Sequence, residues 1–161
     1  MYARIHTAKA PEGAIETHTY RRLAGDDELT LSLFDTQAAA ASDPTAEWYE
    51  VESDDTGAAP TAGVAAFLHF DGPLSAEVKA AADRANRDRI APAMHDHPGF
   101  ARVLVLWQPQ RRSAVVLTMA ESVESLEEGQ RKIGSMELLP GEDPALLPGP
   151  DRIEIFRTVA S

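Results

Sequence analysis

The stretch Gly99-Phe-Ala-Arg-Val-Leu-Val-Leu-Trp-Gln-Pro-Gln-Arg-Arg-Ser-Ala-Val-Val-Leu-Thr-Met-Ala-Glu-Ser122 limits the architectures open to this chain. Two runs in it, 102–107 and 114–119, are rich in Val and Leu, as strands are. They flank Gln108-Pro-Gln-Arg-Arg112, whose proline and polar residues favour a turn. We therefore expect a hairpin of two antiparallel strands.

A similar pattern occurs 86 residues earlier in the chain. Gly13 corresponds to Gly99, Thr17-His-Thr-Tyr20 to Val103-Leu-Val-Leu106, and Leu29, Leu31 and Leu33 to Val115, Leu117 and Met119. At a second offset of 63, Ala3-Arg-Ile-His6 corresponds to Ala66-Phe-Leu-His69. Self-similarity at fixed offsets is typical of a duplicated unit.

The second copy has the complete set of elements. A strand is expected at 64–70, with Ala66, Leu68 and Phe70 on one face and Phe67 and His69 on the other. Ser75 is a suitable N-cap for a long helix that Pro92 ends or kinks. A second helix is expected from Glu121 to about Lys132, and a last strand at 153–159. The resulting order is β-α-β-β-α-β.

The first copy retains strands, at 26–34 and 47–52 among others, and a short helix at 36–41. The change of offset from 63 to 86 means that about 23 residues are missing after its first strand. In the second copy the corresponding residues are expected to form the long helix, and about 23 helical residues would span about 35 Å. We predict an α+β fold of tandem ferredoxin-like units whose sheets pack into a barrel within one chain. The units are a degenerate repeat (1–52), a linker (53–63) and a complete repeat (64–161). The face left bare by the missing helix is a candidate surface for a homodimer.

Composition excludes several classes of protein. The 161 residues carry a net charge of −11, which disfavours binding to nucleic acid, and contain no cysteine. No apolar run is long enough for a membrane span, and the N-terminus lacks a secretory pattern, so a cytoplasmic location is expected. Twelve arginines against three lysines suggest a GC-rich bacterial genome.

His97-Pro-Gly-Phe100, two strands and then Ala120-Glu-Ser-Val-Glu124 follow one another in an order that resembles the dimeric α/β-barrel superfamily. Within it, the chain is most similar to the antibiotic biosynthesis monooxygenase domains. The resemblance covers 64–160 well and the first 52 residues weakly.

This resemblance implies a ligand pocket between a sheet and its helices. Some members are cofactor-free oxygenases that act on polycyclic phenols, with a base and hydrogen bonds to an oxyanion. The haem-degrading branch has an axial histidine at a place that corresponds to the region of Gly129, and no histidine follows His97 here. We therefore expect neither a haem nor another cofactor, and no bound metal.

The candidate catalytic residue is His69, as a general base. Phe67, Val78, Ala82 and Trp107 are the candidate ligand contacts. The alternatives are that His69 and its counterpart His6 only bond to each other, and that Trp107 closes the end of the core. His95-Asp-His97 resembles a metal-binding pair, but the spacing identifies no distant carboxylate to complete a site, and we interpret them as solvent-exposed turn histidines.

The predicted function is binding of a small hydrophobic, aromatic molecule, with cofactor-independent oxidation as the possible chemistry. The alternative is a non-catalytic structural or ligand-sensing protein of the same fold. A large enclosed cavity lined by His69 and Trp107 would favour the enzyme, and a filled interior would favour the alternative.

Overall fold

Strands dominate the computed structural model, which describes residues 1–7 and 11–159. The strands are β1 (Tyr2–His6), β2 (Glu16–Arg22), β3 (Glu28–Phe34), β4 (Trp48–Thr56), β5 (Val64–Phe70), β6 (Phe100–Gln108), β7 (Ser113–Ala120) and β8 (Arg152–Thr158). The helical elements are α1 (Gln37–Ala40), α2 (Ala76–Ala85), the π-helical segment η1 (Asn86–Ile90), α3 (Ala91–His95), α4 (Val123–Ser135) and the short 3-10 helix η2 (Pro144–Leu146).

The strands form a closed antiparallel barrel in the order β1-β3-β2-β8-β5-β7-β6-β4. The first half of the chain contributes β4-β1-β3-β2, and the second half contributes β8-β5-β7-β6. Two seams join the halves: β2 pairs with β8, and β4 pairs with β6. The predicted α+β fold with a barrel is confirmed, while the origin of the halves by duplication stays a prediction.

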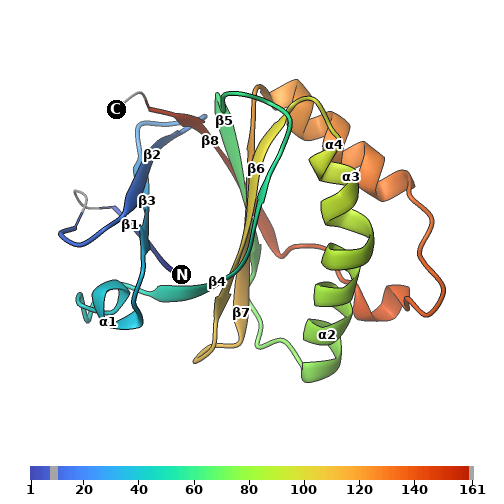
Figure 1. Cartoon of the computed structure of the whole chain (residues 1–161), viewed down its shortest axis with the longest axis horizontal. Helices are drawn as coiled ribbons and strands as arrows, with labels where there is room; N and C mark the ends of the chain where they lie inside the picture. The colour runs from blue at the N-terminus through green and yellow to red at the C-terminus, as the bar shows by residue number, and fades with distance from the viewer. Residues whose placement is uncertain (8–10, 160–161) are drawn as a thin grey trace.

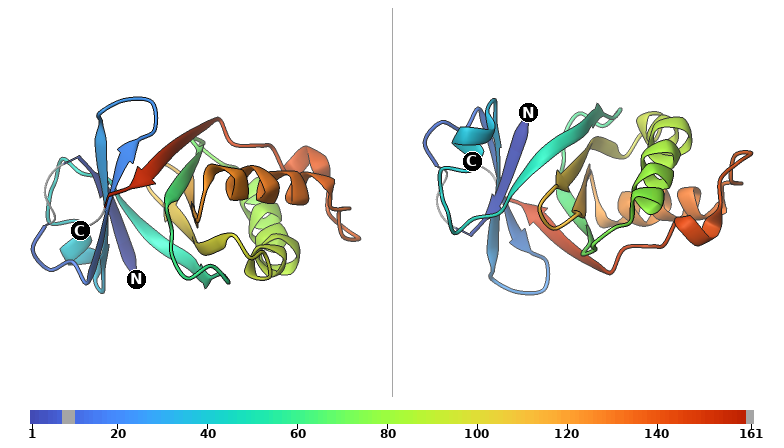
Figure 2. Two further views of the ribbon diagram at one scale, coloured as in Figure 1. Left: turned by 90° about the horizontal axis from the view of Figure 1, so that it is seen from above. Right: turned by 90° about the horizontal axis from the view of Figure 1, so that it is seen from below.

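The helices are distributed unevenly around this barrel. Figure 1 shows α2, α3 and α4 together on the outer side of the sheet that contains β5, β6 and β7, away from β1–β3. The views from above and below agree, and α1 is the one helix that the described residues 1–7 and 11–56 place beside the first half (Figure 2). Within the described part of the chain, the second half therefore has a helical layer outside the barrel that the first half does not have.

Apolar side chains from both halves fill the barrel. The Phe67 ring contacts the rings of Tyr20 and Phe156 edge to face, with centroids 5.5 and 5.1 Å away. The remaining buried members of this core are Ala3, Leu31, Leu33, Tyr49, Ala65, Leu104, Leu106, Val115, Leu117 and Met119. Because strand side chains alternate, the neighbouring residues on each strand point out of the barrel.

The long helix begins as predicted, since the Ser75 hydroxyl accepts a hydrogen bond from the Val78 amide at 3.2 Å. Helical structure then continues to His95 through the π-helical segment. This wider segment directly precedes Pro92, whose ring would otherwise clash with the carbonyl four residues earlier. The proline therefore perturbs the helix without ending it.

Two details differ from the sequence-based expectations. β4 continues to Thr56, four residues into the predicted linker, and its end pairs with β6. His6 and His69 lie on the first strand of their halves but on opposite faces. His6 is 3.0 Å from Ser32 outside the barrel, whereas His69 shares the inward face with Phe67. The offset of 63 is thus out of step by one residue, which exchanges the faces.

Candidate functional site

The helix-facing side of the second-half sheet carries apolar side chains that are only partly buried. Val105 pairs with Val116, Val116 with Leu68, and Leu68 with Ile153, in a line across β6, β7, β5 and β8. Ile153 is 44% exposed, and the other three are partly exposed. We call these four residues the apolar row. Since side chains beneath a tightly packed helix are normally buried, α2 and α4 leave this row accessible.

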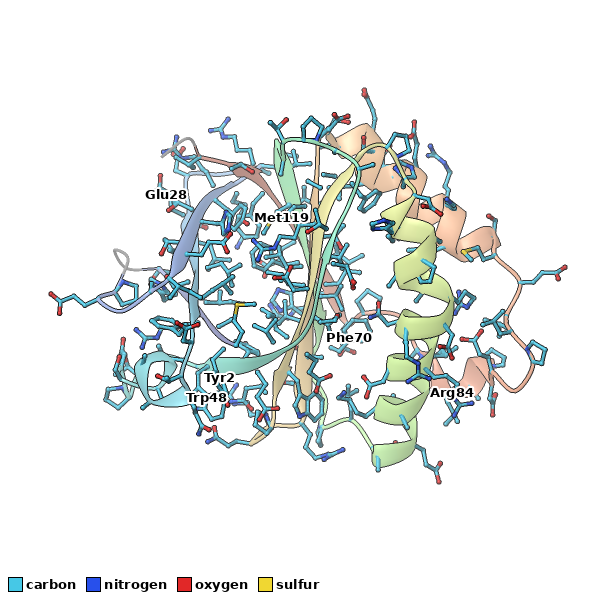
Figure 3. The ribbon with its side chains drawn as sticks, viewed as in Figure 1. Tyr2, Glu28, Trp48, Phe70, Arg84 and Met119 are labelled. Carbon is cyan, nitrogen blue, oxygen red and sulfur yellow. The ribbon has the colours of Figure 1, made fainter. Side chains whose placement is uncertain are left out.

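Next to the apolar row, towards the β6–β7 turn, lie Trp107, Ala114 and Phe70, which pair in the same way. Phe70 projects from the sheet into the layer between the strands and α2 (Figure 3). Trp107 is 8% exposed. Lys79 and Arg112 lie over its ring, 4.9 and 5.5 Å from the centroid, in cation–π contacts.

Neighbouring carboxylates hold Lys79 in place. Its ammonium is 2.6 Å from both Glu52 and Asp83. Burial lowers the pKa of Lys79, but the hydrogen bonds to Asp83 and Glu52 outweigh burial and raise the pKa above its ordinary value. Arg112 donates to the backbone carbonyl of Leu74 at 2.8 Å. Two fixed cations thus cover the tryptophan end of this face.

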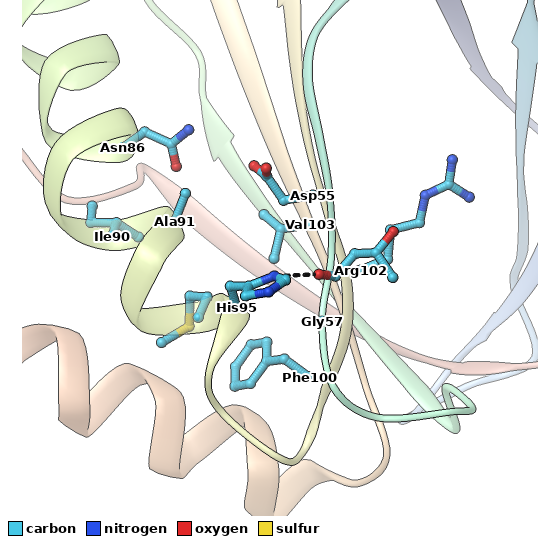
Figure 4. Close-up of a pocket in the computed structure, with 11 residues that line it drawn as sticks. Asp55, Gly57, Asn86, Ile90, Ala91, His95, Phe100, Arg102 and Val103 are labelled. Carbon is cyan, nitrogen blue, oxygen red and sulfur yellow. Dashed lines mark hydrogen bonds between the residues drawn. The ribbon is translucent and has the colours of Figure 1, made fainter.

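A small cavity lies at the opposite end of the same layer (Figure 4). Asp55, Asn86, His95, Phe100 and Val103 contribute to its lining. The cavity volume is about 20 Å³, about the space that one water molecule needs. The His95 Nδ1 is 2.8 Å from the Thr56 carbonyl and donates to it, so this ring nitrogen carries the proton.

His97 is buried between the helices and has a packing role. Its Nδ1 accepts a hydrogen bond from the Gly99 amide at 3.1 Å, and its ring contacts Phe100 edge to face at 4.9 Å. Its Nε2 is 3.7 Å from a carboxylate oxygen of Glu128. His95 is exposed, as the solvent-exposed interpretation expects, whereas His97 is not.

His69 faces the barrel and belongs to a charged cluster at its end. Its Nε2 lies 2.8 Å from Glu154, but the carboxylate is off the direction of the ring N–H, so this contact is not a well-directed hydrogen bond. Burial, followed by the charge of Arg152, lowers the pKa of His69 below its usual value. Glu154 also pairs with Arg22 at 2.7 Å. His69 is therefore neutral at pH 7.

The structure does not bring the five predicted site residues together. Phe67 and His69 face the barrel interior, whereas Trp107 lies on the helix-facing side of the sheet. Ala82 is exposed and Val78 is half-buried. The alternation of side chains along each strand explains this correction, because Phe67 and His69 point to one face of the sheet and Trp107 points to the other. A base at His69 cannot serve a ligand beside Trp107, since the sheet separates them.

Sequence reasoning missed the apolar row as a unit. The alternation of β5 did indicate that Leu68 and Phe70 share a face, and this is confirmed. The register between four strands was needed to align Val105, Val116 and Ile153 with Leu68. That register depends on contacts between residues far apart in the chain, which a periodicity within one strand does not contain.

Among residues 1–7 and 11–159, no group of three or more His, Asp or Glu side chains is arranged to hold a metal ion. No helix in this described part of the chain is long and apolar enough to cross a membrane.

No protein-family model matches the chain, and no curated protein matches its sequence. Solved structures do match its fold. A ferredoxin-fold protein related to antibiotic biosynthesis monooxygenases, from Listeria monocytogenes, has a TM-score of 0.64 at 12% identity and covers 99% of this chain and 95% of its own. A heme-degrading enzyme from Listeria monocytogenes has a TM-score of 0.62 at 11% identity, with coverages of 98% and 99%.

A third structure, a major regulator of staphylococcal pathogenesis, has a TM-score of 0.67 at 6% identity and covers 98% of this chain and 99% of its own. Such low identities show a shared fold, and that fold occurs both in a heme-degrading enzyme and in a regulator of pathogenesis. The resemblance drawn from the sequence is confirmed at this level: the chain has the fold of proteins related to antibiotic biosynthesis monooxygenases.

Proposed function

We propose that this protein binds a small hydrophobic, aromatic molecule between the helices and the outer face of the second-half sheet. The observation that supports this most directly is the apolar row, four paired side chains that remain partly exposed beneath a helical layer. Trp107 borders this surface, but Lys79 and Arg112 cover its ring, so the apolar row provides the area that an aromatic ligand covers. Covering the row with a ligand removes apolar area from water, which is favourable.

The side chains of this face favour binding without chemistry. The apolar row and the adjacent row of Val103, Thr118, Ala66 and Ile155 contain one hydroxyl, that of Thr118, and no ionisable group. The charged groups lie at the two ends, around Trp107 and around His95. Because a cofactor-free oxygenase needs a base next to its phenol, the ligand-sensing alternative agrees better with this arrangement.

Binding is tested with 1-naphthol as the probe. Trp48→Phe leaves Trp107 as the one remaining tryptophan, so its fluorescence reports on this face. We expect saturable quenching and a higher melting temperature, because a ligand that binds only the folded chain stabilises it by mass action. Val116→Phe fills the centre of the row and should abolish both signals, while Ile15→Phe, at a residue 54% exposed elsewhere, should keep them.

Equal quenching in a folded Val116→Phe variant would overturn the proposed site. His69→Ala serves as a further control, since His69 faces the barrel and should not affect binding. Oxygen consumption with 1-naphthol distinguishes the competing function. If the original chain consumes oxygen with 1-naphthol and the Val116→Phe variant does not, the protein is a cofactor-independent oxygenase that uses this site, and the proposal of binding without chemistry is wrong.

A further inference from the structure

A second, larger cavity lies between α2 and the segment 141–147. Its volume is about 250 Å³. Ala80, Ala81 and Arg84 line it from α2, and Glu142, Leu146 and Leu147 line it from the segment. It shares no residue with the apolar row or with the small cavity beside His95.

The cavity contains one nearly buried carboxylate. The Glu142 side chain is 4% exposed and pairs with Arg89, itself 6% exposed, through Oε2 at 2.9 Å. The Leu139 amide donates to the same oxygen at 2.7 Å. The other oxygen, Oε1, is buried and has no hydrogen-bond partner among residues 1–7 and 11–159. A buried acceptor without a donor destabilises the fold. A ligand that donates a hydrogen bond to Oε1 therefore gains more binding free energy than the same hydrogen bond would contribute in water.

Charge and shape define the ligand that the cavity favours. Glu77, Glu142 and Asp143 line the cavity, opposed by Arg84 within it and by Arg89 behind Glu142. Three carboxylates against two guanidinium groups leave an excess of negative charge, which attracts a cation. The alanines and leucines provide an apolar surface for the rest of the molecule.

We propose that this cavity binds a small organic amine whose ammonium donates a hydrogen bond to Oε1 of Glu142. The apolar part of the amine packs against Ala80, Ala81, Leu146 and Leu147. Because protein atoms cover Oε1, the segment around Gly141 shifts to admit the ammonium. Hydrogen bonds between charged groups are about twice as strong as neutral ones, so the amine binds in preference to a neutral alcohol of the same shape.

The experiment compares benzylamine with benzyl alcohol by calorimetry on the full chain at pH 7. We expect saturable binding of benzylamine and binding of the alcohol that is about tenfold weaker or more. Ala81→Leu fills the cavity without removing a charge and should abolish binding of benzylamine. Ala82→Leu is the matched control, because Ala82 is the next residue of α2, is exposed and does not line the cavity.

Glu142→Gln tests the carboxylate itself and should remove the preference for the amine over the alcohol. Glu142→Gln removes the charged partner of Arg89. If that loss prevents folding, the comparison of Ala81→Leu with Ala82→Leu still tests whether benzylamine binds in this cavity. Absence of saturable benzylamine binding to the folded chain, or equal affinity in the Ala81→Leu and Ala82→Leu variants, would overturn the proposal. 1-Naphthol should not displace benzylamine, so this result is independent of the proposed function.

Discussion

At the scale of single residues, the burial of His69 makes the stability of the fold depend on pH. The unfolded chain takes up a proton at a histidine near pH 6.5, whereas in the fold burial and the charge of Arg152 lower the pKa of His69. The unfolded state therefore binds more protons between these two values. The free energy of unfolding therefore decreases as the pH falls below about 6.5. It stops decreasing once the pH is below the pKa that His69 has in the folded chain.

His69→Asn removes this titration. We expect the free energy of unfolding of the variant to decline less than that of the original chain between about pH 7 and pH 5. Urea denaturation at a series of pH values measures this difference, and His95→Asn, at an exposed histidine, is the control. Parallel pH profiles for the original chain and His69→Asn would show that the fold does not lower this pKa.

At this scale, the sequence predicted the faces of β5 correctly but not the partners of its residues. Phe67 and His69 do share one face, and Leu68 shares the other with Phe70. The predicted equivalence of His6 and His69 implied that both side chains point to the same side of the barrel, but His6 points outward and His69 points inward. A shift of one residue in the alignment of the two strands is enough to exchange the inward and outward faces. The site residues were therefore assigned to one pocket although the sheet separates them.

At the scale of the elements, α4 packs so closely against β6 that one of its positions must be a glycine. A Cβ on Gly129 would lie 2.2 Å from the Phe100 ring, so the helix crosses the strand where it has no side chain. Gly134, five residues later in the same helix, has no atom within 4 Å of such a Cβ. Two glycines of one helix thus have different physical roles.

Gly129→Ala should destabilise the fold by about 1–3 kcal/mol, because the ring of Phe100 or the helix must move. Gly134→Ala should instead stabilise the fold by up to about 1 kcal/mol, because alanine favours the helix and meets no obstacle. Thermal denaturation of the two variants measures both effects. A stabilised Gly129→Ala variant would show that this crossing is loosely packed.

The sequence predicted most elements because their signals are local. Ser75 caps α2 as expected, and the hairpin of β6 and β7 lies where its proline-containing turn indicated. The helix expected from Glu121 is present as α4, which begins at Val123 after the cap Ser122. The contact of Lys79 with Trp107 was not predictable from the residues of α2. Alanines dominate this helix, so its apolar stripe is weak, and Lys79 pairs with Glu52 of β4, a residue far away in the chain.

At the scale of the whole molecule, Arg102 links three strands across one end of the barrel. Its guanidinium bonds to Asp54 of β4 through two contacts of 2.8 Å and also to Glu16 of β2. Burial raises the pKa of Glu16, but the hydrogen bonds from Arg102 and His18 outweigh burial and hold the pKa below its usual range. Arg102 and Asp54 lie within the β4–β6 seam, and the contact with Glu16 of β2 adds a further link between the two halves.

Arg102→Met keeps the apolar stem and removes the charge. We expect a loss of about 1–3 kcal/mol in the free energy of unfolding, because Glu16 and Asp54 lose their common partner. Arg157→Met, at an exposed arginine of β8, is the control and should change stability little. Urea denaturation compares the two, and equal effects would mean that Arg102 contributes no more than a solvated surface charge.

The barrel as a whole was predicted from the repeated pattern, and the closed order of strands agrees with that expectation. The seams themselves were not predicted, since β4 extends into the segment taken as a linker in order to pair with β6. Duplication of the halves and association of two chains stay predictions.

The seam between β2 and β8 also affects how the chain acquires its fold during synthesis. Tyr20 pairs with Thr158, so strands from nearly opposite ends of the sequence meet. Pairings of such long sequence separation slow folding, because the chain between them must be ordered first. On the ribosome β8 emerges after the other seven strands of the barrel, so the barrel cannot close at this seam until β8 has been synthesised. During that interval the nascent β2 has an unpaired edge, which exposes this strand to pairing with other chains.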